Sequence, residues 1–268
     1  LTLNSPDNAF PAVKTSVPPG QATTEIKVTI PQPKLWSPDS PVLYPVVMVL
    51  AGPDGKILDR LESYFGLREI STAKAPGRDY QYIYLNGQPL YLAGALHQSF
   101  HPDGIYNYPD DTLMRSDYEL CKRIGINFLR IHIKVPIPRE LYWADQLGVL
   151  IMQDMPCFWQ YNKQAQEWWR QMFESSVERD FNHPSIFSWV LFNETWGLGD
   201  GKYTEDRQKW VADMYHLAKK LDPTRLVEDN SPCNYDHVIT DINSWHFYIN
   251  DYAAARKHIQ EIVDKTFP

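Results

Sequence analysis

The sequence lacks any apolar run near the roughly 18 residues that cross a bilayer, and its mean hydropathy is -0.43. Cysteine is scarce: the three cysteines are widely spaced with no CxxC pair, so neither a disulfide framework nor a zinc knuckle is indicated. There is no excess of positive charge, because 26 Lys and Arg stand against 33 Asp and Glu, for a net charge of -7. These absences exclude a membrane-spanning chain and argue against a nucleic-acid partner.

No GxGxxG or P-loop follows any expected strand, which argues against a nucleotide cofactor. The first residues lack the basic-then-apolar pattern of a signal peptide, and no localisation is predicted. His97 and His101 are four residues apart with Asp103 nearby, but they lie outside a clear helix. We favour hydrogen bonding at a strand end over metal binding there, and we predict neither a metal nor a cofactor.

The composition is that of a globular protein, with 43% hydrophobic and 22% charged residues over 268 positions. This length suits two modest domains or one large one. Aromatic residues reach 13%, including 9 Trp and 16 Tyr. Such a content suits stacking on the apolar faces of sugars as well as ordinary core packing.

Residues 1–74 have the patterns of short β-strands. Apolar residues alternate with polar ones along 24–30, as a half-buried strand requires. Segments 46–50 and 56–65 are expected to pair around a Gly-Pro-Asp-Gly turn. About four strands make roughly half of an immunoglobulin-like sandwich, which has about seven. We therefore expect a partial sandwich whose domain begins before Leu1.

From about residue 80 the pattern changes to strands that alternate with helices, after a hairpin over 82–92. The expected strands are one that ends near Gly94, then 127–133, 149–154, 186–193, 225–229 and 238–248. The expected helices are 111–124, 139–147, 164–181, 205–221 and 252–265. Six β/α units predict a parallel sheet. A closed (β/α)8 barrel needs eight units and about 250 residues, so residues 75–268 form either an incomplete TIM barrel or an open doubly wound sheet.

The fourth expected strand ends in Asn193 and Glu194. Active sites of barrels lie where the strands end. A carboxylate directly after a buried apolar strand is partly dry, which raises its pKa and suits a general acid. Asn193 can bind a substrate hydroxyl. The alternative for Glu194 is a capping or supporting carboxylate.

Other strand ends also carry polar side chains. Alternation along the second strand turns Arg130 and His132 inward, Asp154 ends the third strand, and His246 and Tyr248 share a face of the sixth. We predict that these groups converge on Glu194, although Arg130 alone would equally fit a structural ion pair.

The tryptophans fall into two predicted groups. Trp159, Trp196 and Trp245 are candidates for a sugar-binding platform. A second group of tryptophans is expected to pack in the core or between helices: Trp143, Trp168, Trp169, Trp189 and Trp210.

An ordered series of motifs resembles glycoside hydrolase family 2, which includes β-galactosidases, β-glucuronidases and β-mannosidases. The motifs lie at 33–44, 65–70, 85–90, 183–194 and 221–225. The resemblance covers nearly the whole chain. It implies an immunoglobulin-like sandwich over residues 1–74 and a (β/α)8 barrel over 75–268, here with about six β/α units.

The resemblance also implies retaining hydrolysis of a terminal β-glycoside in carbohydrate catabolism, with a β-galactosidase-like substrate. Glu194 matches the acid/base and Asn193 the partner of the sugar 2-hydroxyl. Arg130 matches the arginine of strand two, and Tyr248 matches a tyrosine near the nucleophile. The implied partners are a carbohydrate substrate and either a second copy or further domains of a parent chain.

A retaining glycosidase needs a second carboxylate about 5–5.5 Å from the acid/base. In the family it ends strand seven, which we expect beyond Pro268, so the chain is expected to be an inactive internal fragment of a longer enzyme. Glu228 and Asp229 could approach the site but do not match the nucleophile motif. Gln98-Ser99 and Gln153-Asp154 replace the family's frequent His-Glu and Asp-Glu. They motivate an alternative, a non-catalytic carbohydrate-binding or scaffold relative.

Overall fold

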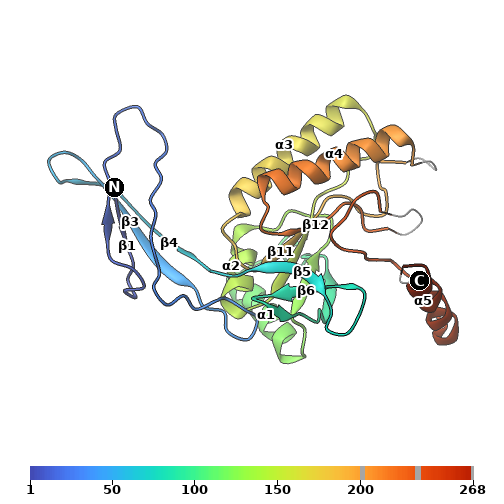
Figure 1. Cartoon of the computed structure of the whole chain (residues 1–268). Helices are drawn as coiled ribbons and strands as arrows, with labels where there is room; N and C mark the ends of the chain where they lie inside the picture. The colour runs from blue at the N-terminus through green and yellow to red at the C-terminus, as the bar shows by residue number, and fades with distance from the viewer. Residues whose placement is uncertain (200–202, 233–236, 267–268) are drawn as a thin grey trace.

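The structure is a computed structural model that describes residues 1–199, 203–232 and 237–266. An antiparallel sheet near the N-terminus projects from a larger body, in which helices surround a parallel sheet (Figure 1). Helix α5 lies apart from the other helices, at the end of an extended segment (Figure 1). The site described below lies in the larger body.

The projecting sheet has the strand order β2-β1-β3-β4 and is antiparallel throughout. Its strands are β1 (Thr2–Asn4), β2 (Val13–Lys14), β3 (Tyr44–Ala51) and β4 (Ile57–Phe65). The β3–β4 hairpin confirms the pairing predicted from the sequence. The strand predicted over 24–30 is wrong: exposure alternates there as expected, but no strand forms. The alternation of apolar and polar residues determines which side chains are buried. It does not provide a neighbouring strand with which the backbone can form hydrogen bonds.

A second antiparallel sheet joins the two predicted domains. Its strands are β5 (Ile70–Lys74), β6 (Gln81–Leu85) and β7 (Gln88–Pro89). Asn86 and Gly87, with φ of 52° and 74°, turn the chain between β6 and β7, because a tight hairpin turn of this kind needs two positive φ angles. β5 thus pairs across the predicted boundary, and the division into residues 1–74 and 75–268 stays a prediction.

The parallel sheet has the strand order β12-β11-β10-β9-β8. Its strands are β8 (Gly94–His97), β9 (Phe128–Ile131), β10 (Leu150–Asp154), β11 (Ile186–Val190) and β12 (Leu226–Glu228). All four neighbouring pairs are parallel, as the β/α pattern predicts. The first strand begins at Gly94 instead of ending there. A Cβ on Gly94 would lie 2.2 Å from the ring of Phe128, so this glycine permits close strand packing.

The helices agree with the predicted ranges within one residue at every end. They are α1 (Asp111–Arg123), α2 (Pro138–Leu147), α3 (Lys163–Asp180), α4 (Glu205–Leu221) and α5 (Tyr252–Thr266). Asp110 and Asn162 cap α1 and α3 by accepting hydrogen bonds from backbone N–H groups. Gly148 ends α2 with φ of 70°.

The strand predicted over 238–248 is wrong, because this segment is irregular. Its backbone N–H groups hydrogen-bond to a side chain and not to a neighbouring strand, since those of Val238 and Ile239 donate to the Asp229 carboxylate. The N–H of His246 donates to the Pro232 carbonyl at 3.1 Å. The parallel sheet therefore ends at β12, and its edge strands are β8 and β12.

Trp36 anchors the N-terminal part of the chain to the body. It is fully buried against Leu150, Met152, Phe187 and Val190 of the parallel sheet. Its indole N–H donates to the Asp145 carbonyl on α2 at 2.8 Å. Trp36 therefore lies at the interface between the N-terminal part of the chain and the parallel sheet.

We expect Trp36→Ala to lower the free energy of unfolding by about 3–5 kcal/mol, because it leaves a cavity and an unpaired buried carbonyl. Urea unfolding followed by circular dichroism measures the change. The control is Leu35→Ala, whose side chain is 43% exposed and whose loss should cost far less. Equal effects of the two substitutions would contradict the anchoring role.

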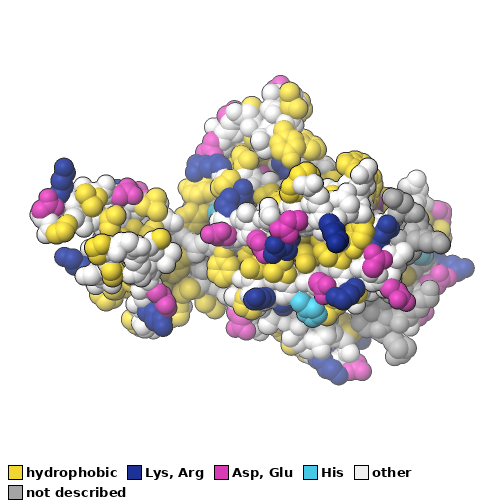
Figure 2. Space-filling model, turned by 90° about the horizontal axis from the view of Figure 1, so that it is seen from above, with side chains coloured by type: hydrophobic (Ala, Val, Ile, Leu, Met, Phe, Trp, Pro, Cys, Tyr) yellow, Lys and Arg dark blue, Asp and Glu magenta, His cyan; other side chains and the backbone are white. Residues whose placement is uncertain are grey.

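In the part of the chain that the structure describes, no helix has the length and apolarity needed to cross a membrane. Within the same residues, no three His, Cys, Asp or Glu side chains are grouped so that they could hold a metal ion. Lys and Arg are interspersed with Asp and Glu on the face that Figure 2 shows.

Candidate active site

A cavity of about 480 Å³ opens at the carboxyl-terminal edge of the parallel sheet. Seven of the eight site residues predicted from the sequence line it: Arg130, His132, Asn193, Glu194, Trp196, His246 and Tyr248. Asp154 is nearly fully buried and does not line it. Although 238–248 is no strand, it still brings His246 and Tyr248 to the ends of the other strands.

The turn after β11 sets the position of Glu194. Glu194 and Thr195 have φ of 50° and 63°, in the left-handed region that side chains rarely adopt. Two contacts hold this turn: Glu194 N–H donates to the Ser231 carbonyl, and Thr195 N–H donates to the Asn230 side chain, both at 2.9 Å. Backbone strain held by neighbouring groups is common where a side chain must point into a site.

Three donors converge on the Glu194 carboxylate. Oε1 accepts from His246 Nδ1 at 2.7 Å and from the Tyr248 hydroxyl. Oε2 accepts from the indole Nε1 of Trp196 at 3.1 Å. Partial burial raises the pKa of Glu194, but these hydrogen bonds outweigh burial, so that the pKa lies below its ordinary value. The raised pKa predicted from the sequence is therefore wrong, because that prediction counted burial without the donors.

Arg130 connects three of the other groups. Its Nε and Nη2 donate to the Asp154 carboxylate at 2.8–3.1 Å. Nη2 also donates to Asn193 Oδ1 at 2.8 Å, and Nη1 lies 2.9 Å from His246 Nε2. A guanidinium can only donate, so His246 Nε2 accepts and the ring proton is on Nδ1. That tautomer donates to Glu194, so Arg130 orients the acid/base candidate through His246.

Asp154 acts as the counterion of Arg130. It is nearly fully buried and also accepts from the N–H of Ile133 at 3.1 Å. Burial raises the pKa of Asp154, and Arg130 opposes that rise. Because Oδ1 of Asn193 accepts from Arg130, its NH2 group is the part that can donate to a substrate oxygen.

Gln98 and Ser99, where the resemblance leads us to expect His-Glu, make different contacts in the structure. The Gln98 amide contacts His132 Nδ1 at 2.9 Å, beside the cavity. Burial lowers the pKa of His132, which favours the neutral ring. Ser99 is buried and donates to Glu140 at 2.7 Å. Gln98 thus stands next to the site, while Ser99 supports the body.

Sequence reasoning missed three lining residues, Leu96, Ile133 and Cys157. Each lies in or just after a strand of the parallel sheet, so strand-end position alone was the available signal. Burial raises the pKa of the Cys157 thiol to about 11, which keeps it protonated.

Glu228 and Asp229 do not line the cavity. Glu228 is fully buried, accepts from the Ser244 hydroxyl, and has a pKa that burial raises. Asp229 accepts from the backbone of 238–239 and lies 2.7 Å from His237 Nδ1. Both carboxylates therefore hold the segment that carries His246 in place.

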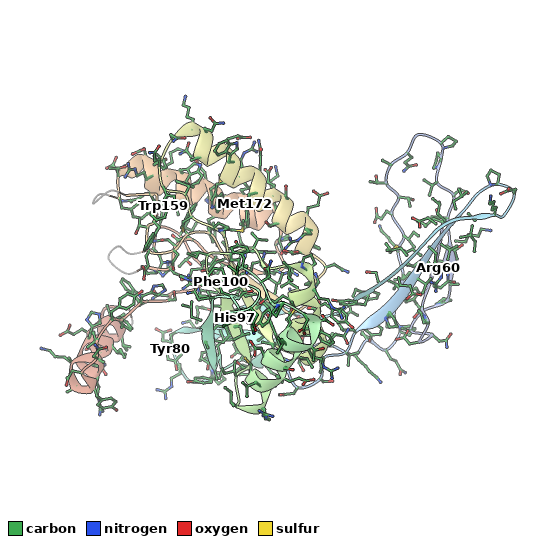
Figure 3. All side chains as sticks on the ribbon, turned by 180° about the vertical axis from the view of Figure 1, so that it is seen from behind. Arg60, Tyr80, His97, Phe100, Trp159 and Met172 are labelled. Carbon is green, nitrogen blue, oxygen red and sulfur yellow. The ribbon has the colours of Figure 1, made fainter. Side chains whose placement is uncertain are left out.

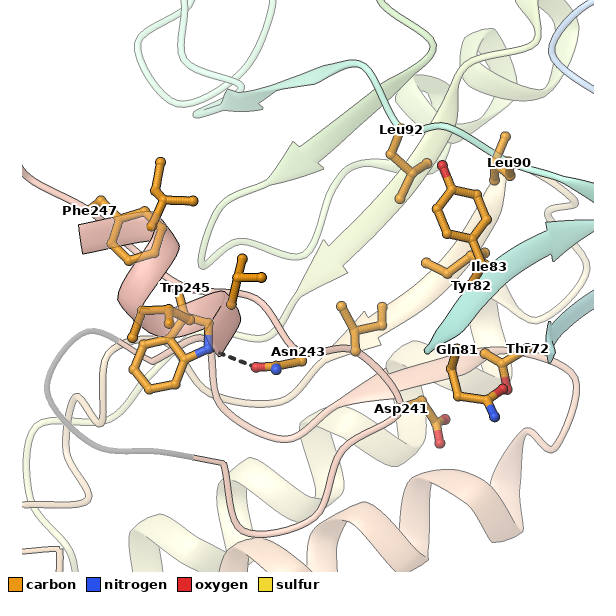
Figure 4. Close-up of a pocket in the computed structure, with 14 residues that line it drawn as sticks. Thr72, Gln81, Tyr82, Ile83, Leu90, Leu92, Asp241, Asn243, Trp245 and Phe247 are labelled. Carbon is orange, nitrogen blue, oxygen red and sulfur yellow. Dashed lines mark hydrogen bonds between the residues drawn. The ribbon is translucent and has the colours of Figure 1, made fainter. Parts of the chain in front are cut away.

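The predicted platform of three tryptophans is only partly formed. Trp159 and Trp196 meet edge to face with ring centroids 5.9 Å apart. Trp245 lies elsewhere: it lines a separate cavity between β6 and α5, and its indole donates to Asn243 at 2.7 Å (Figure 4). His97, the first member of the discounted metal pair, lies 3.1 Å from Glu140 and contacts Tyr108.

A parallel β/α sheet with a carboxylate, an arginine and aromatic rings at its strand ends is consistent with part of the TIM barrel of a glycoside hydrolase. The family description "Glycosyl hydrolases family 2, TIM barrel domain" matches residues 78–266, and "Glycosyl hydrolases family 2" matches residues 4–68. The chain belongs to glycosyl hydrolase family 2.

Similar proteins carry related names. A "Putative beta-glucuronidase" of Formosa agariphila is 29% identical over 88% of this chain and 28% of its own length. A "Beta-galactosidase" of Vibrio cholerae is 28% identical over 76% of this chain and 19% of its own length. The solved structure of Bacteroides uniformis beta-glucuronidase 2 superposes with a TM-score of 0.82 at 21% identity, covering 98% of this chain and 34% of its own. The chain thus spans 19–34% of the length of these relatives.

Proposed function

We propose that the protein containing this chain hydrolyses terminal β-glycosides with retention and that Glu194 is its acid/base. The observation that carries this proposal is the Glu194 carboxylate, held by three donors in a cavity at the strand ends. Arg130, His132 and Asn193 are proposed to bind the sugar, together with Trp196, His246 and Tyr248. The names of the relatives support the reaction class.

We propose a neutral sugar such as a β-galactoside as the substrate, in preference to a uronic acid. Among the described lining residues, Arg130 is the one permanent cation, and Asp154 already neutralises it. Recognition of a sugar carboxylate calls for a cation that can pair with it. Neutral hydroxyls match the amide of Asn193 and the ring of His132.

In the proposed mechanism a second carboxylate attacks the anomeric carbon while Glu194 gives its proton to the departing glycosidic oxygen. Glu194 then takes a proton from the water that releases the sugar. We propose that the second carboxylate comes from a part of the protein outside this chain, since the relatives are several times longer. Its negative charge would raise the pKa of Glu194 and provide the protonated acid.

The full-length protein can be assayed with 4-nitrophenyl β-D-galactoside and 4-nitrophenyl β-D-glucuronide while proton NMR follows the first product. We expect turnover of the galactoside with the β-anomer of galactose formed first. An α-anomer formed first would overturn retention, and turnover of the glucuronide alone would overturn the neutral substrate.

A second candidate is a non-catalytic carbohydrate-binding relative. Gln98-Ser99, and the absence of a second carboxylate from the described cavity-lining residues, favour it. Sugar binding without turnover by the full-length protein would support it.

Association with further domains or a second copy also stays a proposal. The exposed apolar side chains of Ile57, Leu58 and Leu61 on β4 support it. We expect the 268-residue chain alone to be silent on aryl glycosides.

The hydrogen bond from His246 gives a pH prediction. His246→Phe removes one donor that lowers the pKa of Glu194, so Glu194 should stay protonated to higher pH. The alkaline limb of the kcat/KM profile should therefore move upward. Asparagine can place an N–H near the position of Nδ1, so His246→Asn is the matched control and should keep the original limb. An unchanged limb in His246→Phe would contradict the role of His246.

A further inference from the structure

A second cavity of about 530 Å³ lies beside the active site, between the loop after β10 and the first turns of α3. Its walls include Trp159, Trp168 and Met172, with Gln160 and Gln164. Cys157 lines both cavities, so the two adjoin. Trp159 and Met172 are labelled near α3 and α4 in Figure 3.

The tryptophans of this region are unusually exposed. Trp159 is 82% exposed, Trp168 64% and Trp196 47%. The assignment of Trp168 to helix packing is therefore wrong; its neighbour Trp169 is the one that packs in the core. Large aromatic surfaces left in water beside a catalytic cavity commonly mark a binding surface. The three rings lead from Glu194 outward, through Trp196 and Trp159 to Trp168.

Glu194 indicates which part of a substrate meets these rings. Its Oε1 already accepts from His246 and Tyr248, whereas among the residues that the structure describes Oε2 accepts from Trp196 alone. The transferable proton therefore belongs on Oε2, on the side of Trp196. The glycosidic oxygen must approach that atom, so the departing group lies toward Trp196 and the second cavity.

We infer that this cavity and its tryptophans bind the leaving-group side of the substrate and that the ligand is an oligosaccharide. This inference rests on the proposed function. The indoles of Trp159 and Trp196 meet at 63°, so they form no parallel slot for a flat aromatic group. Each ring instead presents one face, as suits the C–H face of a sugar, and the amides of Gln160 and Gln164 can bind hydroxyls.

The test compares two substrates of the full-length protein: 4-nitrophenyl β-D-galactoside and a chain of four β-1,4-linked galactose units. We expect Trp168→Ala to lower kcat/KM for the tetrasaccharide by about 10-fold and to leave kcat/KM for the aryl galactoside nearly unchanged. Tyr91→Ala is the control, since Tyr91 is 75% exposed but lines neither cavity. Equal losses on both substrates, no loss on either, or a loss confined to the aryl substrate would overturn the inference.

Binding separates this inference from the proposed activity. Calorimetry of the tetrasaccharide with the Glu194→Gln protein measures affinity without turnover. If the wild type hydrolyses no glycoside but Trp168→Ala still weakens tetrasaccharide binding, the proposed hydrolysis fails and the binding surface stands. If the wild type is active and Trp168→Ala leaves affinity unchanged, the surface fails and the activity stands.

Discussion

Glu194→Gln in the full-length protein is expected to slow hydrolysis of glycosides with poor leaving groups by about 10²–10⁴-fold, the usual contribution of general acid–base catalysis. Hydrolysis of activated aryl glycosides should fall far less in the first step, because a nitrophenolate departs without a proton. The measurement is kcat/KM on 4-nitrophenyl β-D-galactoside and on methyl β-D-galactoside. The difference between the two substrates is the diagnostic result.

Glu194→Gln should remove the acid/base group without disturbing the surrounding structure. Glutamine retains a carbonyl oxygen that can accept from His246 and Tyr248, so the loop that carries them should stay in place. Glu178→Gln, at an exposed position on α3, is the matched control and should leave both rates unchanged. Equal losses on both substrates would contradict the acid/base role and favour the supporting carboxylate.

Arg130→Met should destabilise the folded chain by about 3–5 kcal/mol, the usual cost of removing one partner of a buried ion pair. Methionine fills a similar volume but leaves Asp154 without its counterion and leaves Asn193 and His246 without their donor. The tautomer of His246 is then no longer fixed. Activity in the full-length protein should fall together with stability.

The loss in Arg130→Met should depend on pH. Burial already raises the pKa of Asp154, and removing Arg130 raises it further. A carboxyl whose pKa is raised on folding stabilises the fold when protonated and loses that contribution as pH rises through the folded pKa. Urea unfolding should therefore show a smaller deficit near about pH 5 than near about pH 8.

A double variant provides the control for this pair. Arg130→Met with Asp154→Leu should recover much of the stability, since a buried ion pair can often be replaced by apolar groups. It should not recover activity, because His246 and Asn193 stay unsupported. A deficit that is independent of pH, or no recovery in the double variant, would contradict the counterion role of Asp154.

Patterns with one dominant physical cause could be predicted from the sequence. Helices α1 to α5 follow from apolar periodicity and from caps such as Asp110 and Asn162. The buried strands of the parallel sheet follow from short apolar runs. The segments 24–30 and 238–248 could not be predicted, because each has the residues of a strand but no strand pairs with it. Pairing depends on long-range placement, which a local pattern does not contain.

The site shows the same division. Strand ends predicted which residues gather at the cavity, and seven of the named side chains line it. Their bonding was not predictable: the pKa of Glu194 depends on donors from Trp196, His246 and Tyr248, and two of these lie on an irregular segment. Exposure likewise distinguishes Trp168 from its neighbour Trp169, although the two are adjacent in sequence.

The contacts of Asp145 determine whether the N-terminal domain can be removed or exchanged. Its backbone carbonyl holds Trp36, and its carboxylate accepts from the Tyr64 hydroxyl at 2.8 Å and from the Ser185 N–H at 3.0 Å. Arg68 adds bonds to the Pro184 and Ile186 carbonyls. A barrel expressed from residue 75 onward would keep Asp145 and Ser185 but lose the Trp36 indole and the Tyr64 hydroxyl that donate to Asp145. An exchange of N-terminal domains between relatives must therefore transfer Trp36, Tyr64 and Arg68 together with matching partners at 145 and 184–186.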